Sequence, residues 1–232
     1  MNSANPSAPN AGGASPSGSG RKASKPWVLV KELSKNAHWR LRKHFLALDE
    51  HDRLLRFGSV LPDELIVKYV EGIDFERDTV FGVYDGRLRL VGVGHLAFAP
   101  RDALPVLSSA TTKERVAEFG VSVSASARGK GVGSKLFERA AIRCRNADID
   151  TLYMHCLSSN KVMMHIAKKA GMEIHRDYGE ADAYLQLPPA NPASMLQEAV
   201  EEQVATFDYT LKANARAAVK LLEQWPRFRR DR

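Results

Sequence analysis

A glycine-rich stretch in the middle of the chain has the residue types of a phosphate-binding turn. Residues 128–133 read Arg-Gly-Lys-Gly-Val-Gly and stand between a strand-like and a helix-like pattern. Glycines let a ligand approach the backbone, and amides at a helix N-terminus point outward at the positive end of the helix dipole. The two cations add formal charge. The stretch therefore suits a phosphate or pyrophosphate, although such turns also close ordinary strand-to-helix connections.

Two known nucleotide motifs can be tested on these residues. A P-loop requires Gly, four residues, then Gly-Lys-Ser/Thr. Here Gly133 is followed by Ser134 and Lys135, so the hydroxyl and the lysine stand in the wrong order. A dinucleotide fingerprint requires GxGxxG, whereas the run from Gly129 ends in Ser134. The P-loop is excluded, and the dinucleotide site remains only as an outside alternative.

The elements around the turn follow a mixed α/β pattern. Apolar spacing predicts helices, alternation predicts strands, and Asp85-Gly86 predicts a hairpin turn. The predicted order is helices over 37–48 and 63–70, a hairpin of strands 80–84 and 88–98, a strand over 115–123, a helix over 136–144, a strand over 152–156, a helix from 160 to 171 and an extended segment over 183–187.

Three segments are expected along the chain. Residues 1–26 are mostly Ser, Gly, Pro, Ala and Asn, which predicts a disordered low-complexity tail. Residues 27–187 form the predicted domain. Residues 188–232 are expected to form a long amphipathic helix and a basic tail, with Ser194 and Gln197 in a capping box and Pro226 as the stop. The apolar stripe of this helix either packs on its own domain or pairs with a second copy to give a homodimer.

Arg128, Gly131 and Gly133 match the Arg/Gln-x-x-Gly-x-Gly/Ala signature of the GNAT superfamily of N-acetyltransferases, and the chain resembles that family at two further places. Residues 121–123 precede the turn as the family's cofactor-pairing strand does. Residues 160–172 resemble its Asn-led helix, with Met172 in place of a Phe. The resemblance implies an α/β (α+β) fold with a mixed, mostly antiparallel central sheet flanked by helices, here with a long C-terminal helix.

The resemblance also implies acetyl-CoA as cosubstrate. The pantetheine arm would pair with the strand at 121–123, the turn would supply amides to the pyrophosphate, and Asn160 would lie near the arm. Asn160 is equally suited to cap its helix. The cofactor-binding residues expected on this basis are Val121, Ser122, Val123, Arg128, Gly129, Lys130, Gly131, Val132, Gly133, Ser134 and Asn160.

Acetylating an amine requires a neutral nucleophile, and a lysine-type amine has a pKa near 10.4, so a base must accept a proton. Glu118 interrupts an apolar strand just before the cofactor-pairing residues, where several GNAT enzymes have a general base; a partly exposed strand residue or a buried ion-pair partner is the alternative. The fold implies a backbone amide near Val121 for the oxyanion. Ala167 stands where the family often has the tyrosine that protonates the thiolate, so another group would be the general acid. Candidates are Tyr153, Tyr178, Tyr184, Ser158 and Ser159.

The acceptor is expected to be an amine of a small molecule or a protein. The early helices usually wall this site in the family, so their cations could contact a carboxylate-bearing acceptor or simply be solvated. These residues are Arg40, Arg42, His44, Arg53 and Arg56. His95 is expected either to line the cleft or to be a structural histidine. Because of Ala167, a non-catalytic CoA-sensing or interaction module is the alternative to an enzyme.

Composition narrows the kinds of site, location and partner that remain to be considered. The two cysteines have no CxxC partner and no zinc-like spacing, which predicts no disulfide framework, no metal and a cytoplasmic location. No run approaches the about 18 apolar residues of a membrane span. The net charge of +7 favours anionic partners. Nucleic acid is not the expected partner, because basic and aromatic residues are not interleaved.

Overall fold

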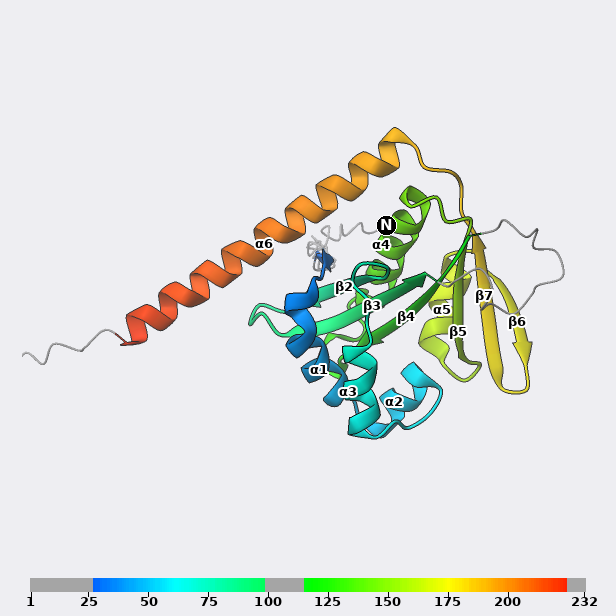
Figure 1. Cartoon of the computed structure of the whole chain (residues 1–232), viewed down its shortest axis with the longest axis horizontal. Helices are drawn as coiled ribbons and strands as arrows, with labels where there is room; N and C mark the ends of the chain where they lie inside the picture. The colour runs from blue at the N-terminus through cyan, green and yellow to red at the C-terminus, as the bar shows by residue number, and fades with distance from the viewer. Residues whose placement is uncertain (1–26, 99–114, 225–232) are drawn as a thin grey trace, which may run out of the picture.

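The computed structural model describes residues 27–98 and 115–224 of the chain, which form one central sheet and six α-helices (Figure 1). In chain order the elements are β1 (Lys31–Glu32), the 3-10 helix η1 (Lys35–Ala37), α1 (His38–Leu46), α2 (Glu50–Phe57), α3 (Asp63–Glu71), β2 (Thr79–Tyr84), β3 (Leu90–Phe98), β4 (Val116–Val123), the 3-10 helix η2 (Ala125–Ala127), α4 (Val132–Asn146), β5 (Thr151–Leu157), α5 (Lys161–Lys169), β6 (Glu173–Asp177), β7 (Glu180–Gln186) and α6 (Pro192–Gln224).

The strands form a seven-stranded sheet in the order β1-β2-β3-β4-β5-β7-β6. Only the central pair, β4 and β5, is parallel; the other neighbours are antiparallel. This confirms the predicted mixed, mostly antiparallel sheet. It also places the one parallel connection at the glycine-rich turn, because α4 carries the chain from β4 across to β5.

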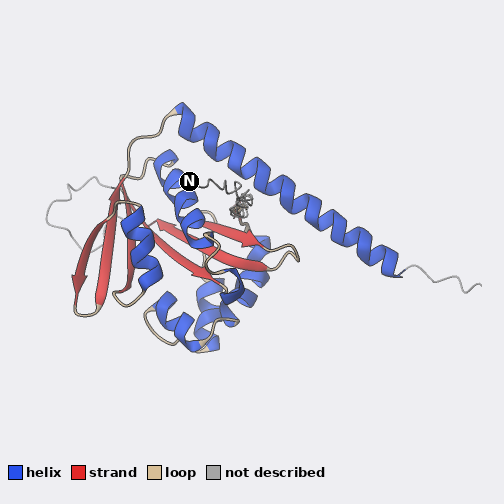
Figure 2. Ribbon diagram, turned by 180° about the vertical axis from the view of Figure 1, so that it is seen from behind, coloured by secondary structure: helices blue, strands red, loops and turns tan. Residues whose placement is uncertain are grey.

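Helices lie on both faces of the sheet. On one face α4 and α5 pack over it, as Figure 2 shows, and bury Phe81, Leu96 and Phe119 against Leu136 of α4. On the opposite face α1 and α3 form a second core. Its fully buried members are Leu41, Phe45, Ile66 and Val80. Side chains alternate across each strand, so the two cores share β2 and β3 between them.

Most predicted elements are present, and three further ones carry weaker signals in the sequence. The strands β1 and β6 are short or exposed and have little apolar alternation. The helix α2 does have helix signals, since Asp49 caps it by accepting from the Asp52 amide and Gly58 ends it in the left-handed conformation. It escapes prediction because it is only eight residues long, so its apolar residues Leu54, Leu55 and Phe57 span about one turn.

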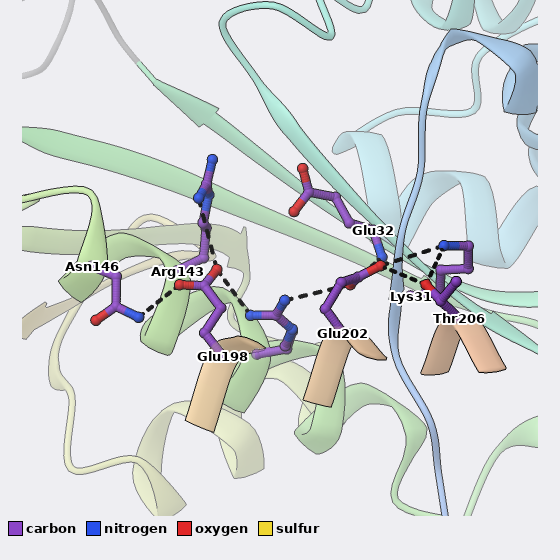
Figure 3. Close-up of polar contacts among 8 residues, drawn as sticks. Lys31, Glu32, Arg143, Asn146, Glu198, Glu202 and Thr206 are labelled. Atoms are coloured by element: carbon purple, nitrogen blue, oxygen red, sulfur yellow. Dashed lines mark hydrogen bonds and ion pairs between the residues drawn. The ribbon is translucent and has the colours of Figure 1, made fainter. Parts of the chain in front are cut away.

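The long C-terminal helix is confirmed, and it docks on the domain through polar contacts. Figure 3 shows Glu198 and Glu202 of α6 facing the core. Glu198 lies 3.1 Å from the guanidinium of the fully buried Arg139, and it accepts a hydrogen bond of 2.6 Å from Asn146. Glu202 accepts from the backbone amide of Glu32 at 3.1 Å. These contacts fix the first half of α6 against α4 and β1.

The capping box at the start of α6 differs from the prediction by three residues. Asn191, rather than Ser194, is the cap: its Oδ1 accepts from the Ser194 amide at 2.8 Å, and the Ser194 hydroxyl accepts from the Asn191 amide at 3.1 Å. The two residues satisfy each other's amides, as in a capping box with Ser at its third position. The sequence is misleading here because Ser194 is itself a good capping residue.

The predicted tail at 1–26 and the basic residues beyond 224 lie outside the described residues. Within the described part of the chain, no helix has both the length and the apolar content to cross a membrane. The division into a domain over 27–187 and a separate C-terminal region over 188–232 stays a prediction, although α6 contacts α4 and β1 closely.

Candidate active site

The sheet forks between β4 and β5. The two strands pair only over Val116–Glu118 and Thr151–Tyr153. Beyond Glu118, residues 119–123 of β4 still pair with β3, but the described residues give them no strand on the β5 side. Residues 121–123, the expected pantetheine-pairing segment, lie on this open edge. An edge strand presents unpaired amides and carbonyls, so an extended ligand can add to it as a strand would.

The glycine-rich turn lies next to the fork and has the backbone that an anion site needs. Gly129 and Gly131 have φ angles of 71° and 80°, a region that favours glycine. Gly131 is the N-cap of α4, and the Lys135 amide donates to its carbonyl at 3.0 Å. The amides of the first helical residues, 132–134, have no intrahelical acceptor. They lie at the positive end of the α4 dipole.

The two cations of the turn make contacts within the protein. Arg128 pairs with Asp52 of α2, and its Nε donates to the Val123 carbonyl at 3.2 Å. Lys130 donates to the Ser126 carbonyl at 2.8 Å. Their charge is therefore close to the α4 terminus, while the groups that face an anion there are backbone amides.

Asn160 and α2 close the other side of the fork. Asn160 is buried and caps α5, with its Oδ1 accepting from the Met163 amide at 3.1 Å. Its Nδ2 donates to the Leu55 carbonyl of α2 at 3.4 Å. The capping role is thus present in the structure, and contact with pantetheine stays a prediction. Because Asp52 holds Arg128 as well, α2 links the turn to α5 across the fork.

Glu118 lies at the point where the strands separate. It is the last β4 residue paired with β5, opposite Tyr153, and its side chain is exposed. Burial raises the pKa of Tyr69 and of Tyr153, and the nearby charge of Glu118 adds to both shifts. Strand pairing places the carboxylate beside Tyr153.

A chain of hydrogen bonds that the sequence did not reveal stands beside Glu118. His95 on β3 lies 3.2 Å from Asp78 through Nε2 and 2.8 Å from the Tyr69 hydroxyl through Nδ1. Burial, followed by the charge of Arg56, lowers the pKa of His95, so the imidazole is neutral. Nε2–H then donates to Asp78 and Nδ1 accepts from Tyr69. The Tyr69 oxygen in turn accepts from Arg56 at 2.7 Å.

Arg56 is the end of this chain and lies directly on β4. A Cβ built on Gly120 would come within 2.7 Å of its guanidinium carbon, so only glycine leaves room for it there. The ring of Phe57 lies 5.0 Å from the same carbon. Arg56 forms no ion pair within the described residues. Of the residues expected on the early helices, Arg56 and His44 reach the strand of Glu118, at Gly120 and Ser122 respectively.

Arg53 and His44, two further residues of this set, have structural roles. Arg53 donates to the Leu48 and Leu61 carbonyls and pairs with Asp63 at 2.7 Å. His44 is buried, with Nδ1 donating to the Leu90 carbonyl at 3.1 Å and Nε2 accepting from the Ser122 hydroxyl at 2.8 Å. Burial lowers the pKa of His44 to about 4, so it is neutral. His44 therefore holds the side chain of Ser122, while the backbone of Ser122 lies on the open edge of β4.

The candidates for the general acid differ in burial and in hydrogen-bond partners. Ala167 is buried on the core face of α5 and has no hydroxyl to donate. Tyr178 is fully exposed in the β6–β7 turn. Tyr153 stands beside Glu118 and donates to Asp182 at 2.6 Å.

Cys156 is buried in the core, and burial raises its pKa. Among the described residues no group of His, Cys, Asp and Glu could hold a metal ion.

Comparison with known proteins agrees with this geometry. The model of the acetyltransferase (GNAT) family matches residues 38–172, more than half of the 232-residue chain. The fold and the fork define an acetyltransferase-like protein, and the chain belongs to the GNAT acetyltransferase family. A search of curated protein sequences found no match.

Solved structures share the fold at low identity. The GNAT domain of S. lividans PAT is 19% identical with a TM-score of 0.56, over 69% of this chain and 90% of that one. Salmonella typhimurium yncA with its cofactor acetyl-CoA is 14% identical with a TM-score of 0.52, over 71% and 96%. Spermidine N-acetyltransferase from Vibrio cholerae, in complex with CoA and spermine, is 17% identical with a TM-score of 0.52, over 68% and 95%.

Proposed function

We propose that this protein transfers the acetyl group of acetyl-CoA to a primary amine of a small molecule or protein, by direct attack, with Glu118 as general base. The observation that carries the proposal is the position of Glu118 at the point of the fork. An acyl group delivered along the open edge of β4 would arrive beside this carboxylate. The common chemistry of the family supports the same reaction.

The residues of the fork suit acetyl-CoA. The open edge at Val121–Val123 would pair with the pantetheine arm, and the amides of Gly129–Ser134 would bind the pyrophosphate. Asn160 holds α5 and α2 at the far side of the arm. A neighbour of the same fold is described with acetyl-CoA as its cofactor, which supports this choice of cosubstrate.

The side chains around Glu118 suit deprotonation of an amine. Glu118 would take the proton as the nitrogen bonds to the acyl carbon. Arg56 nearby would disfavour the ammonium form, because a like charge lowers an amine's pKa. A backbone amide near Val121 would donate to the carbonyl oxygen as negative charge develops. The thiolate then leaves, and Tyr153, which pairs with Glu118 across the fork, would return a proton to it.

Both cysteines, Cys144 and Cys156, are free and buried, which supports a reducing compartment. We accordingly propose a cytoplasmic location, which fractionation of the native cells would test.

The experiment is CoA release from acetyl-CoA over a panel of amines, with Glu118→Gln and the matched surface variant Glu71→Gln. Glu118→Gln should lower kcat by about 10²- to 10⁴-fold, because positioned general bases contribute on this scale. It should leave acetyl-CoA affinity and the folded state unchanged. Glu71→Gln, on the exposed end of α3, should behave as wild type.

Equal kcat for Glu118→Gln and wild type would remove Glu118 from the mechanism. Tight acetyl-CoA binding without turnover for any amine would instead favour the non-catalytic CoA-binding module, which the absence of a hydroxyl at Ala167 also permits.

A further inference from the structure

The open half of the sheet carries a row of acidic and aromatic side chains that begins at Glu118. Strand register places Glu118 beside Tyr153, Tyr153 beside Tyr184, and Tyr184 beside Glu173. Paired residues point to the same face of a sheet, so these four stand abreast across β4, β5, β7 and β6. At about 4.8 Å per strand, the row is about 14 Å long.

A second row lies directly behind the first on the same face. It consists of His155, Asp182 and His175. Asp182 accepts from the Tyr153 hydroxyl and lies 2.8 Å from His155 Nδ1. We name the two rows together the acidic ledge: Glu118, Tyr153, Tyr184, Glu173, His155, Asp182 and His175. In the described part of the chain, the helix nearest to this face is α2, whose main strand contacts are with β4 and β5.

The ledge is negative at neutral pH, in a chain whose net charge is +7. Burial raises the pKa of Asp182, but hydrogen bonds from Tyr153 and His155 outweigh it and hold that pKa below its ordinary value. Burial and the charge of Asp182 raise the pKa of Tyr184, so the phenol stays neutral. Two neighbouring histidines contact the acids: His155 also lies 3.8 Å from Glu180, and His175 lies 3.0 Å from Glu173.

We propose that the acidic ledge is the acceptor site and that it takes a linear aliphatic polyamine. The reacting amine would lie at Glu118, the methylenes over the half-buried ring of Tyr184, whose centroid is 5.1 Å from that of the buried Tyr153, and a second ammonium at Asp182 and Glu173. Cations are attracted to both carboxylates and aromatic faces. Arg56 lies against β4 at Gly120 and would repel an ammonium there, so the chain must extend along the ledge.

This inference rests on the proposed acetyl transfer, and its test keeps the two apart. We would compare kcat/KM for a linear triamine with that for an alkyl monoamine of equal length. The triamine should be favoured by about tenfold or more, and the preference should shrink as salt rises. Glu173→Gln should raise KM for the triamine about fivefold, with kcat and the monoamine unaffected. Asp182→Asn should raise this KM by a similar factor and should also change kcat, because Asp182 accepts from the Tyr153 hydroxyl. Glu64→Gln, on α3, is the matched control.

The possible outcomes distinguish failure of the acidic ledge from failure of the proposed acetyl transfer. Equal kcat/KM for triamine and monoamine would overturn the ledge while leaving acetyl transfer intact. A stronger preference for a lysine-rich peptide than for the triamine would also overturn it. If no amine released CoA, the proposed function would fail, and calorimetric binding of the triamine to wild type and to the Asp182→Asn/Glu173→Gln double variant would still test the ledge. Equal affinity of the two proteins would contradict it.

Discussion

The two halves of the sheet differ in how they are covered. Strands β1 to β4 have helices on both faces, with one core under α1 and α3 and another under α4. Strands β5, β7 and β6 have α5 on one face, and the other carries the acidic ledge. The fork lies at the boundary. The covered half can thus hold a rigid backbone edge for a cosubstrate, while the open half presents side chains to an acceptor.

The largest expected effect is on the free energy of unfolding, where a truncation in the covered half should cost more than one on the open half. Phe119→Ala should cost about 3–5 kcal/mol of unfolding free energy, because Phe119 is fully buried against Phe137, with ring centroids 5.6 Å apart. Tyr184→Ala, on the ledge, should cost much less, since its side chain is half-buried. Urea unfolding of both variants checks this. Similar losses of unfolding free energy in the two variants would mean that both halves of the sheet contribute alike to stability, which would contradict the comparison.

Acid should weaken the covered half through His44. Its folded pKa is about 4, and its unfolded pKa is near 6.5. The unfolded chain therefore binds the proton first, so this contribution is complete above pH 6.5 and is lost as pH falls toward 4, by about 3 kcal/mol in total. The lowered pKa of His95 acts in the same direction.

Urea unfolding at a series of pH values measures the His44 effect. His44→Gln should flatten the dependence between pH 6.5 and about 4, whereas His155→Gln, on the exposed ledge, should retain most of it. An unchanged slope in His44→Gln would show that another group controls acid stability.

A smaller effect is expected at the turn. A Cβ on Gly133 would lie 3.2 Å from Ile166 Cδ1, so Gly133→Val would crowd α5 and the α4 terminus. We expect acetyl-CoA affinity to fall by about ten- to hundredfold, the scale of overpacking. Gly86→Ala, where nothing lies within 4 Å, is the control for calorimetric titration. Unchanged acetyl-CoA affinity in Gly133→Val would show that the turn does not bind the cosubstrate.

The smallest effect concerns Asn160. Asn160→Ala should cost about 1 kcal/mol, because it removes the cap of α5. Asn160→Asp keeps a cap acceptor but loses the donor to the Leu55 carbonyl. Unfolding measurements should therefore find Asp the milder change. If Asn160→Asp were as costly as Ala, the link to α2 would matter more than the cap.

Local signals predict the parts of the site that are contiguous in sequence. The strand, turn and helix over residues 116–146 are expected because alternation, glycines and helical spacing follow one another there. The chain from Arg56 through Tyr69 and His95 to Asp78 is not, since it joins residues from separate elements, and only the folded chain brings them together. The acidic ledge escapes prediction for the same reason: strand register assembles it, and β6 carries no clear strand pattern.

Amide hydrogen exchange with and without acetyl-CoA tests the central claim most directly. The account predicts that acetyl-CoA slows exchange at the amides of Val121–Val123 and Gly129–Ser134, while the amides of β6 and β7 exchange as before. Protection confined to other regions, such as the open groove of about 290 Å³ lined by Lys161, Lys168 and Arg176, would contradict it. So would the absence of any protection at a saturating concentration of the cosubstrate.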